Sequence, residues 1–247
     1  MFAEHPVFEP PGDPTSPLWR YMDLAKFLSL LVRRELFFPS AARLGDPFEG
    51  SYPAANIRLR PEWYGEHAAE IDRQAHGEKL RRLESTLISC WHMGLVESAA
   101  MWQLYSQRGY GIAVVSNYDR LRDGIIRDQP FYIGKVRYLR YDTDPMPEGN
   151  LFDAFVHKRA SFAHEQELRI VTERYVPPGT TQAWLLADGP PPYCGDYLPV
   201  ALDTLVEAVV VGPKTPGWVR ESVEAAARRF ELGVEVRPSE LDASPQY

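Results

Sequence analysis

The sequence predicts an α+β fold, in which a mixed, strongly twisted sheet forms the core of a single domain and helices flank it. Apolar strand-like runs alternate with amphipathic helix-like stretches along most of the chain. The 247 residues are 45% hydrophobic and 12% aromatic, which is enough for a substantial core. No repeat and no clear linker interrupts residues 18–247, so we expect one domain there.

Residues 1–17 differ from the rest because repeated prolines remove backbone donors and favour extended chain. We expect a proline-rich N-terminal arm that is laid over the domain or left loose, and we place it outside the core.

Strands and helices are expected to alternate through residues 18–125. Strand-like or extended apolar runs occupy residues 18–22, 36–41, 86–92 and 111–116. Helical patterns cover residues 24–35, 61–86, 97–107 and 117–125. Asp23 and Asn117 are suitable N-caps for two of these helices.

The remainder continues the same pattern. Strands are predicted over residues 134–142, 167–172, 207–213 and 233–241. Helices are predicted over residues 151–165 and 217–232. The proline and glycine cluster of residues 176–196 indicates a long loop or hairpin.

Composition excludes several classes of function. The 27 Lys and Arg against 34 Asp and Glu give a net charge of −7, so no global positive field is available for nucleic acid or anionic membranes, and only a local basic groove stays open. The two cysteines show no zinc-ligand spacing, and we expect no metal site. The start of the chain lacks the features of a secretory signal and no apolar run is long enough to cross a bilayer, so we expect a cytoplasmic protein without a membrane partner.

The candidate site residues in the first half of the chain are polar or aromatic groups on predicted strands. Arg20 lies between two aromatic residues, where it either pairs within the fold or binds an anion. Strand alternation places Ser89 and Trp91 on one face and His92 on the other. With Tyr105 on the next helix, these rings suit a stacking pocket, although a core role explains an aromatic helix face equally well.

Glu165 and Glu167 stand where a helical pattern passes into a strand. Strand alternation puts both on the face of Arg169 and away from Leu168 and Ile170, so we expect them to look outward together. They are either a solvated face neutralised by Arg169 or a pair of carboxylates in a site. Glu167, at the entrance of the strand, is the stronger candidate, and Glu165 belongs to the loop.

Several separated segments carry a resemblance, namely LWRYMDLAKFL, LFFPSAARLGDPFEG, SCWHMGLVESAAMWQLYS and FAHEQELRIV. Over residues 18–241 the chain resembles a bacterial family known as a domain of unknown function. It is also remotely similar to ADP-ribosyltransferases, which place an Arg or His on a first core strand, a Ser, Thr or Tyr on a second, and a Glu-x-Glu or Gln-x-Glu at the start of a later strand. Arg20, Ser89 and Glu165-Gln166-Glu167 follow in that order.

The transferase resemblance implies a site that uses NAD as its substrate. Glu167 would stabilise the ribosyl cation and Glu165 would orient the acceptor, which would be a protein or a nucleic acid. Arg20 would clamp the dinucleotide and Ser89 would support the site. The nicotinamide ring would be framed by Trp91, His92 or Tyr105. The resemblance further implies an intracellular toxin or defence effector, and an exchange of Glu167 for Gln that removes activity with little change in stability.

Two other hypotheses stay open. The same cleft would suit an enzyme that processes nucleotides or RNA phosphodiesters, with His92 or His164 as acid and base and Arg20 or Arg169 on the phosphate. Alternatively, the chain is a non-catalytic nucleotide-binding module.

Overall fold

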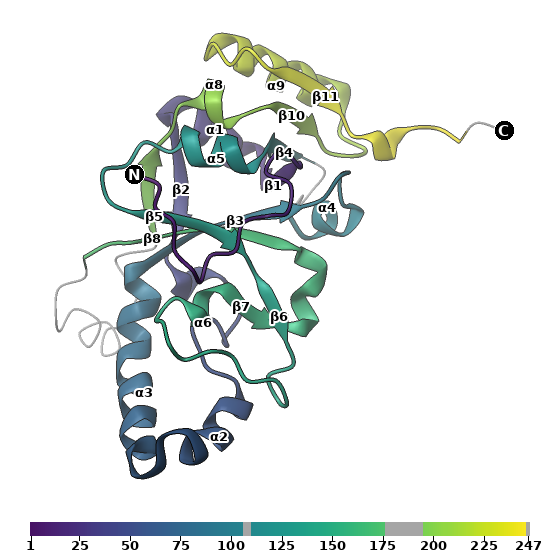
Figure 1. The fold of residues 1–247 in the computed structure, drawn as a ribbon. Coiled ribbons are helices and arrows are strands. Elements are labelled where there is room, and N and C mark those ends of the chain that lie inside the picture. The colour runs from purple at the N-terminus through teal and green to yellow at the C-terminus, as the bar shows by residue number, and fades with distance from the viewer. Residues whose placement is uncertain (106–109, 176–194, 246–247) are drawn as a thin grey trace, which may run out of the picture.

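The computed structural model describes residues 1–105, 110–175 and 195–245, and it has an α+β fold around one large mixed sheet (Figure 1). The seven strands of this sheet are, in spatial order, β11 (Glu235–Pro238), β10 (Ala208–Val211), β4 (Gly111–Ser116), β1 (Leu18–Asp23), β3 (Thr86–Met93), β8 (Glu167–Glu173) and β5 (Phe131–Lys135). β10 and β11 run parallel, and the other neighbours run antiparallel. The predicted α+β class and mixed sheet are confirmed.

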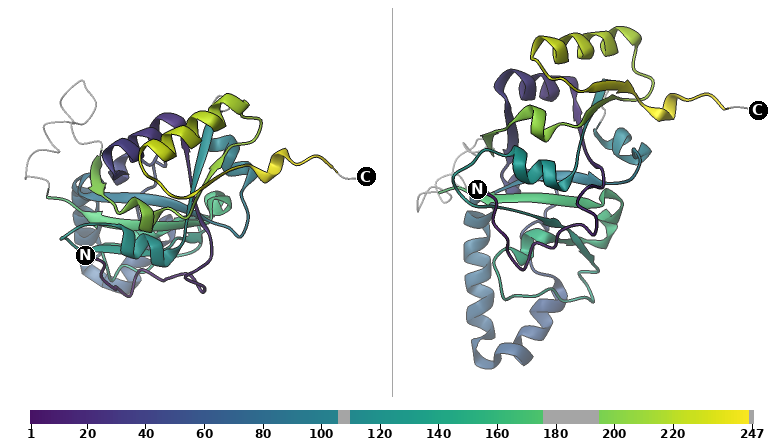
Figure 2. Two further views of the ribbon diagram at one scale, coloured as in Figure 1. Left: turned by 90° about the horizontal axis from the view of Figure 1, so that it is seen from above. Right: turned by 45° about the horizontal axis from the view of Figure 1, so that its top comes forward.

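One face of the sheet is covered by a helical layer. Its helices are α1 (Leu24–Arg33), α5 (Tyr118–Gly124), α8 (Leu202–Leu205) and α9 (Gly217–Arg229). Their apolar side chains form a large buried cluster with those of the sheet. α1 and α9 lie side by side above the strands (Figure 2). Asp23 caps α1 as predicted, because its carboxylate accepts a hydrogen bond of 2.8 Å from the Lys26 backbone N–H.

The opposite face of the sheet is covered in two separate halves. One half packs against Met101 and Trp102 of α4 (Ala99–Tyr105). The other half packs against Phe155 of α6 (Asp153–Val156) and against Phe8 of the N-terminal segment. Because both faces are covered, β4 is buried along its whole length, and β8 is buried at every residue except the last, Glu173.

The sheet divides between β1 and β3. These strands pair only at Leu18 with Met93 and at Trp19 with His92. β1 keeps its pairing with β4 along its whole length, and β3 stays paired with β8 from Thr86 to His92. The facing edges of β1 and β3 therefore separate into a fork, which opens backbone groups of both strands to the same space.

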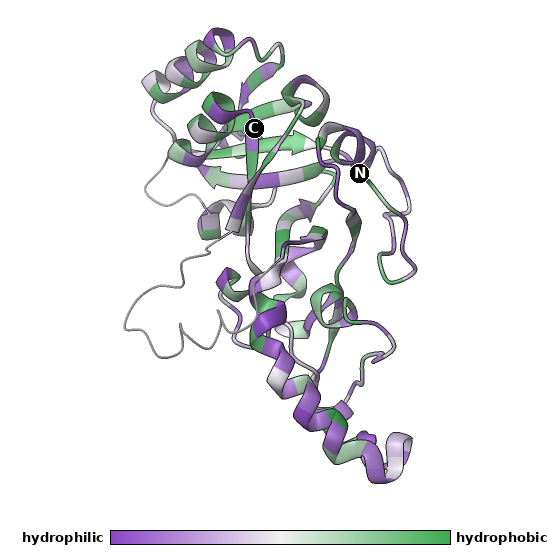
Figure 3. Ribbon diagram, turned by 90° about the vertical axis from the view of Figure 1, so that its left-hand side faces the viewer, coloured by the Kyte–Doolittle hydropathy of each residue, from purple (hydrophilic) through white to green (hydrophobic). Residues whose placement is uncertain are grey.

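Two small ladders and a helical pair lie outside the main sheet. β2 (Glu35–Pro39) pairs antiparallel with β9 (Gly195–Pro199), and β6 (Arg137–Leu139) pairs parallel with β7 (His157–Arg159). α2 (Ala54–Tyr64) and α3 (Ala68–Ser85) extend away from the sheet and are mostly hydrophilic (Figure 3). No helix in the described residues has the length and apolar character required to cross a bilayer.

The prediction that the N-terminal arm lies outside the core is wrong. Phe8 is only 6% exposed, and its ring stacks on Tyr132 with the centroids 5.1 Å apart. The arm also bonds to the edge of β5, where the Ala3 N–H donates to the Phe131 carbonyl and the Lys135 N–H donates to the Glu9 carbonyl. The arm is not extended throughout, because Pro6 and Pro14 lie in turns closed by hydrogen bonds from the Phe8 N–H to the His5 carbonyl and from the Ser16 N–H to the Asp13 carbonyl.

Two predicted elements in the second half are also wrong. The single strand expected over residues 134–142 is divided into β5 and β6. The helix expected over residues 151–165 ends at Val156; the chain then forms β7 and a short 3₁₀ helix over Ala160–Glu165. β7 exists because it pairs with β6, a tertiary contact that helical periodicity does not reveal. The long loop predicted over residues 176–196 lies almost wholly outside the described residues.

Exchange of Phe8 for Ala should lower the free energy of unfolding by about 3–5 kcal/mol, since it removes a buried ring from the core. Urea unfolding followed by circular dichroism measures the change. Leu95→Ala is the control, because Leu95 is 79% exposed and its truncation should have almost no effect. An equally small effect for Phe8→Ala would show that the arm does not belong to the folded unit.

Candidate functional site

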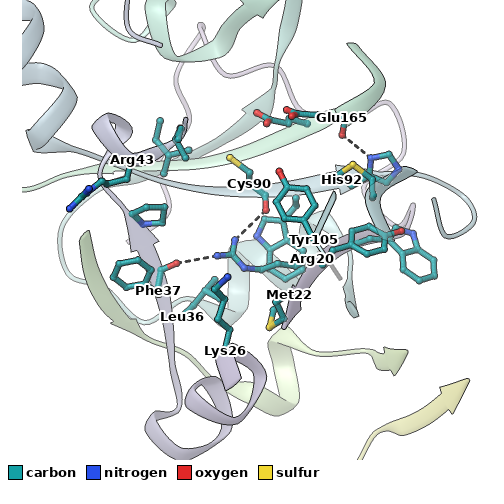
Figure 4. A pocket seen from close by; sticks show the side chains of 18 of the residues that line it. Arg20, Met22, Lys26, Leu36, Phe37, Arg43, Cys90, His92, Tyr105 and Glu165 are labelled. Atoms are coloured by element: carbon teal, nitrogen blue, oxygen red, sulfur yellow. Dashed lines mark hydrogen bonds between the residues drawn. The ribbon is translucent and has the colours of Figure 1, made fainter. Parts of the chain in front are cut away.

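A large pocket lies in the fork between β1 and β3. Its volume is about 1100 Å³. It is lined by all residues of β1 except Leu18, by much of β2 and β3, and by four residues of α1 (Figure 4). Residues 43–46 and the side chains of Tyr105, Lys158, Phe162, Glu165 and Glu167 also line it. Arg20 and Glu167 belong to opposite faces of the sheet by strand alternation, yet both reach this pocket because the sheet is divided here.

Arg20 holds the two sides of the fork together. Its Nη1 donates to the Ser89 hydroxyl at 2.5 Å and to the Cys90 carbonyl at 3.2 Å, and its Nη2 donates to the Phe37 carbonyl at 3.2 Å. All of these acceptors are neutral, and Arg20 forms no ion pair with a carboxylate of the described residues. Of the five N–H groups of a guanidinium, Nε–H and one N–H of Nη2 are left for a ligand. Arg20 is thus a positive charge without a countercharge on the pocket wall.

Ser89 and Trp91 lie beneath Arg20. Ser89 has no exposed surface and does not line the pocket, so it reaches a ligand only through Arg20. Trp91 is 1% exposed; its Nε1 donates to the Ser89 hydroxyl at 3.1 Å, and its ring lies 5.8 Å from the Arg20 guanidinium carbon. These two residues support Arg20 from below and offer almost no surface of their own.

His92 and Tyr105 lie on the other side of the pocket. The His92 Nδ1–H donates to the Glu165 carbonyl at 2.7 Å, and burial lowers the pKa of the imidazole, so it is neutral. Tyr105 is 44% exposed at the end of α4. Burial raises the pKa of the Tyr105 phenol, the Glu165, Cys90 and Glu167 charges raise it further, and Arg20 lowers it. The Tyr105 hydroxyl thus lies within the fields of Arg20 and of both glutamates.

The expectation that Glu165 and Glu167 look outward is wrong. Glu165 is 8% and Glu167 5% exposed. Strand alternation identified the face of Glu167 correctly, but α6 and β7 cover that face. Glu165 approaches Glu167 because Gln166 between them adopts a left-handed conformation, with φ of 43° and ψ of 53°, which ends the 3₁₀ helix and reverses the chain. A strained non-glycine residue beside two buried carboxylates is a feature of functional sites.

The two glutamates belong to a buried cluster of charges. Arg169 has no exposed surface and donates from Nε to Glu167 at 2.6 Å. Its two Nη groups bind both carboxylate oxygens of Glu49, at 2.7 and 3.0 Å. The Lys158 ammonium bonds to Glu165 and, at 3.0 Å, to Glu167. The ion pair between Arg169 and Glu167, which the structural alternative for these glutamates requires, is therefore present, although the pair is buried rather than solvated and Glu167 also lines the pocket.

The cluster gives the two glutamates opposite protonation behaviour. The pKa of Glu165 rises to about 7, first because of burial and then because of the adjacent Glu167 carboxylate. Burial also acts on Glu167, but the charges of Arg169 and Lys158 and the hydrogen bond from Glu165 together hold its pKa below the ordinary value. Glu167 is an anion at neutral pH, while Glu165 is poised to gain or lose a proton.

Sequence patterns missed Lys158, and they marked Glu49 only as a polar residue of the loop segment LGDPFEG. Lys158 fell inside the expected helix over residues 151–165, where a lysine is an ordinary solvated residue. Glu49 fell in a loop and gave no signal of burial, yet it is 5% exposed and binds Arg169 with both oxygens. The described residues contain no group of His, Cys, Asp and Glu side chains arranged to hold a metal ion.

The stability of the fold should depend on pH through Glu165. Its folded pKa of about 7 lies above the ordinary value of 4.5, so its contribution is complete at pH 4.5 and is lost as the pH rises through 7. Urea unfolding at pH 5 and pH 8 should therefore show that Glu165→Gln loses less stability over this range than the wild type. Glu66→Gln is the control, because the Glu66 side chain is 90% exposed. Parallel losses in the wild type and Glu165→Gln would rule out the raised pKa.

No protein-family model matches the chain, and no curated protein matches it in sequence. Several solved structures of DarT from Thermus sp. 2.9 are similar to it. The complex with NAD⁺ has a TM-score of 0.43 at 10% identity, over 94% of this chain and 98% of that chain. The complex with ADP-ribosylated single-stranded DNA has a TM-score of 0.41 at 13% identity, over 94% and 95%.

Proposed function

We propose that the chain is an NAD-dependent ADP-ribosyltransferase whose active site is the pocket in the fork. The observation that carries the proposal is that one pocket combines an arginine without a countercharge, Arg20, with a buried carboxylate pair, Glu165 and Glu167. NAD contains the two matching parts, an anionic pyrophosphate and a ribose that becomes cationic as nicotinamide leaves. A volume of about 1100 Å³ has room for such a dinucleotide.

The anionic part of the substrate is assigned to Arg20. Its free Nε–H and Nη2–H groups suit a phosphate, because a guanidinium presents parallel donors to two oxygens. Burial lowers the pKa of Arg20 from its ordinary value, which reflects the cost of a charge held without a partner. A bound pyrophosphate would remove that cost, so Arg20 favours an anion in the pocket.

The reacting ribose is assigned to the carboxylate end. When nicotinamide leaves with the electron pair of its glycosidic bond, C1′ of the ribose gains positive charge, and Glu167 provides a fixed anion to stabilise it. The cluster keeps a net charge of −1 when all of its groups are ionised, since three glutamates (Glu49, Glu165, Glu167) face two cations (Lys158, Arg169). The cluster is therefore negative while Glu165 is ionised, and Arg169 and Lys158 balance the other two carboxylates once Glu165 holds a proton.

Glu165 is assigned the role of the base that takes the proton from the acceptor. As the acceptor's nucleophilic atom forms its bond to C1′, the proton of that atom passes to the Glu165 carboxylate, so the products are the ADP-ribosylated acceptor, nicotinamide and a proton for solvent. A base with a pKa of about 7 accepts a proton and returns it to water at neutral pH. Tyr105, half exposed at the mouth, would border the nicotinamide ring, whereas Trp91 acts through Arg20.

The phosphodiester hypothesis has less support from the same contacts. Arg169 has no exposed surface, does not line the pocket and bonds to Glu49, Glu167 and the Phe155 carbonyl, so a phosphate in the pocket does not reach it. The neutral His92 is bound to a backbone carbonyl, and His164 is exposed and does not line the pocket.

Exchange of Glu167 for Gln should reduce nicotinamide release from labelled NAD by about 10²–10³-fold, because it removes the anion beside the ribosyl cation. It should also cost about 1–3 kcal/mol of stability, because Glu167 is a buried partner of Arg169 and Lys158. The expectation of unchanged stability is therefore revised. The matched control is Glu49→Gln. Glu49 is the second carboxylate bound to Arg169 and does not line the pocket, so this variant should retain most of the activity.

Comparison of Glu167→Gln with Glu49→Gln separates a catalytic from a purely structural role of Glu167. Equal losses of activity in both variants would mean that Glu167 is only structural. Saturable binding of NAD to the wild type without nicotinamide release would indicate a binding module.

We also propose that the enzyme is an intracellular toxin or defence effector, in which case wild-type expression arrests growth of a host and Glu167→Gln expression does not.

Exchange of Arg20 for Lys should raise the KM for NAD by about tenfold, since a lysine keeps the charge but presents no parallel donors to a phosphate. Initial rates over a range of NAD concentrations measure it. Arg73→Lys is the same exchange on the exposed surface of α3 and should leave KM unchanged. A normal KM in Arg20→Lys would place the pyrophosphate elsewhere.

A further inference from the structure

Lys158 is a buried lysine at the centre of the carboxylate pair. It lies on β7 opposite Tyr138 of β6, and its side chain is 6% exposed. Its ammonium bonds to Glu165 and, at 3.0 Å, to Glu167, and it lies 4.5 Å from the centre of the Phe162 ring. It also lines the pocket. A lysine is almost never buried in this way unless it is paired, so both carboxylates are needed to hold it there.

The two carboxylates are held differently. Glu167 is bound on both oxygens, with Lys158 on Oε1 and Arg169 on Oε2. Lys158 is the only cation among the described residues that bonds to the Glu165 carboxylate. Arg169 bonds to Glu49, Glu167 and the Phe155 carbonyl but not to Glu165. One ammonium therefore joins a doubly bound carboxylate to a singly bound one.

We propose that Lys158 is the positioning residue of the site, which bridges the two glutamates so that Glu167 stays anionic for the ribosyl cation and Glu165 takes the acceptor's proton. This role rests on the proposed transferase function. In the reaction Lys158 forms no covalent bond and loses no proton; the proton released by the acceptor passes to Glu165 while Lys158 keeps its charge.

The electrostatics of Glu165 agree with this geometry. Lys158 lowers the pKa of Glu165, and burial and the Glu167 carboxylate raise it, so the value of about 7 depends on Lys158. Titratable groups on the surrounding elements also act on this cluster through charges or bonds: Cys90 and His92 on β3, Tyr105 on α4, Tyr138 on β6, Arg169 on β8 and Glu49 in the loop before α2. None of these is a second cation bonded to Glu165, so loss of the Lys158 charge should raise the pKa of Glu165 clearly.

A lysine suits this place better than an arginine. An ammonium is a compact charge with three donors that can point to separate carboxylates, whereas a planar guanidinium favours both oxygens of one carboxylate. Arg169 shows the second behaviour in the same cluster, because it binds Glu49 with two parallel bonds. The cluster thus uses each cation for the geometry that it provides.

The test reads the proton on Glu165 without relying on activity. Carboxyl ¹³C NMR of glutamate-labelled wild type should show one signal that titrates near pH 7 and is absent from Glu165→Gln. In Lys158→Met this signal should titrate at least about one pH unit higher, a tenfold gain in proton affinity. In Lys158→Arg it should return towards the wild-type value. Lys135→Met, which removes a lysine paired only with Glu9, should leave it in place.

Kinetics complete the test. The acid limb of the pH profile for transfer should move to higher pH in Lys158→Met and return in Lys158→Arg, which a purely structural role would not cause. Lys158→Gln, also uncharged, replaces Lys158→Met if that variant does not fold. An unmoved Glu165 signal and acid limb would overturn the role of Lys158. A shifted signal in a protein that never releases nicotinamide would support the electrostatic assignment and overturn the transferase function.

Discussion

Arg169 lies fully inside the protein and holds Glu49, Glu167 and the Phe155 carbonyl with one guanidinium. A buried charge is tolerated only when its partners are in place, so this residue requires the loop of Glu49, the end of α6 and the start of β8 to meet at one point. Lys158 then joins Glu165 to the same cluster. The position of the carboxylate pair is thus a consequence of satisfying Arg169.

The fork between β1 and β3 has a complementary role. Two strands that pair at only two positions leave unpaired edges, which would normally be a liability. Arg20 occupies this gap and bonds to Ser89 and Cys90 on one side and to Phe37 on the other. The same residue that holds the fork together therefore presents to the pocket a guanidinium that forms no ion pair within the described residues. The stability of the fork and the proposed binding of an anion depend on one side chain.

The charge arrangement also explains how two adjacent glutamates come to behave differently. Both are buried, and burial alone would raise the pKa of each. Two cations act on Glu167 and one on Glu165, so the proton that the pair retains near neutrality resides on Glu165. An acid–base group and a permanent anion arise side by side from residues of the same type.

The sequence by itself determined the α+β class, most of the strands, the cap at Asp23 and the candidate residues Arg20, Glu165 and Glu167, because periodicity, capping chemistry and residue type are local properties. Only the tertiary structure decided that Glu167 faces inward, since alternation identifies a face of a strand but not what covers it. β7 likewise depends on pairing with β6, and this pairing brings Lys158 to the glutamates. Burial and strand pairing depend on contacts between residues far apart in the chain, and a local sequence pattern does not reveal such contacts.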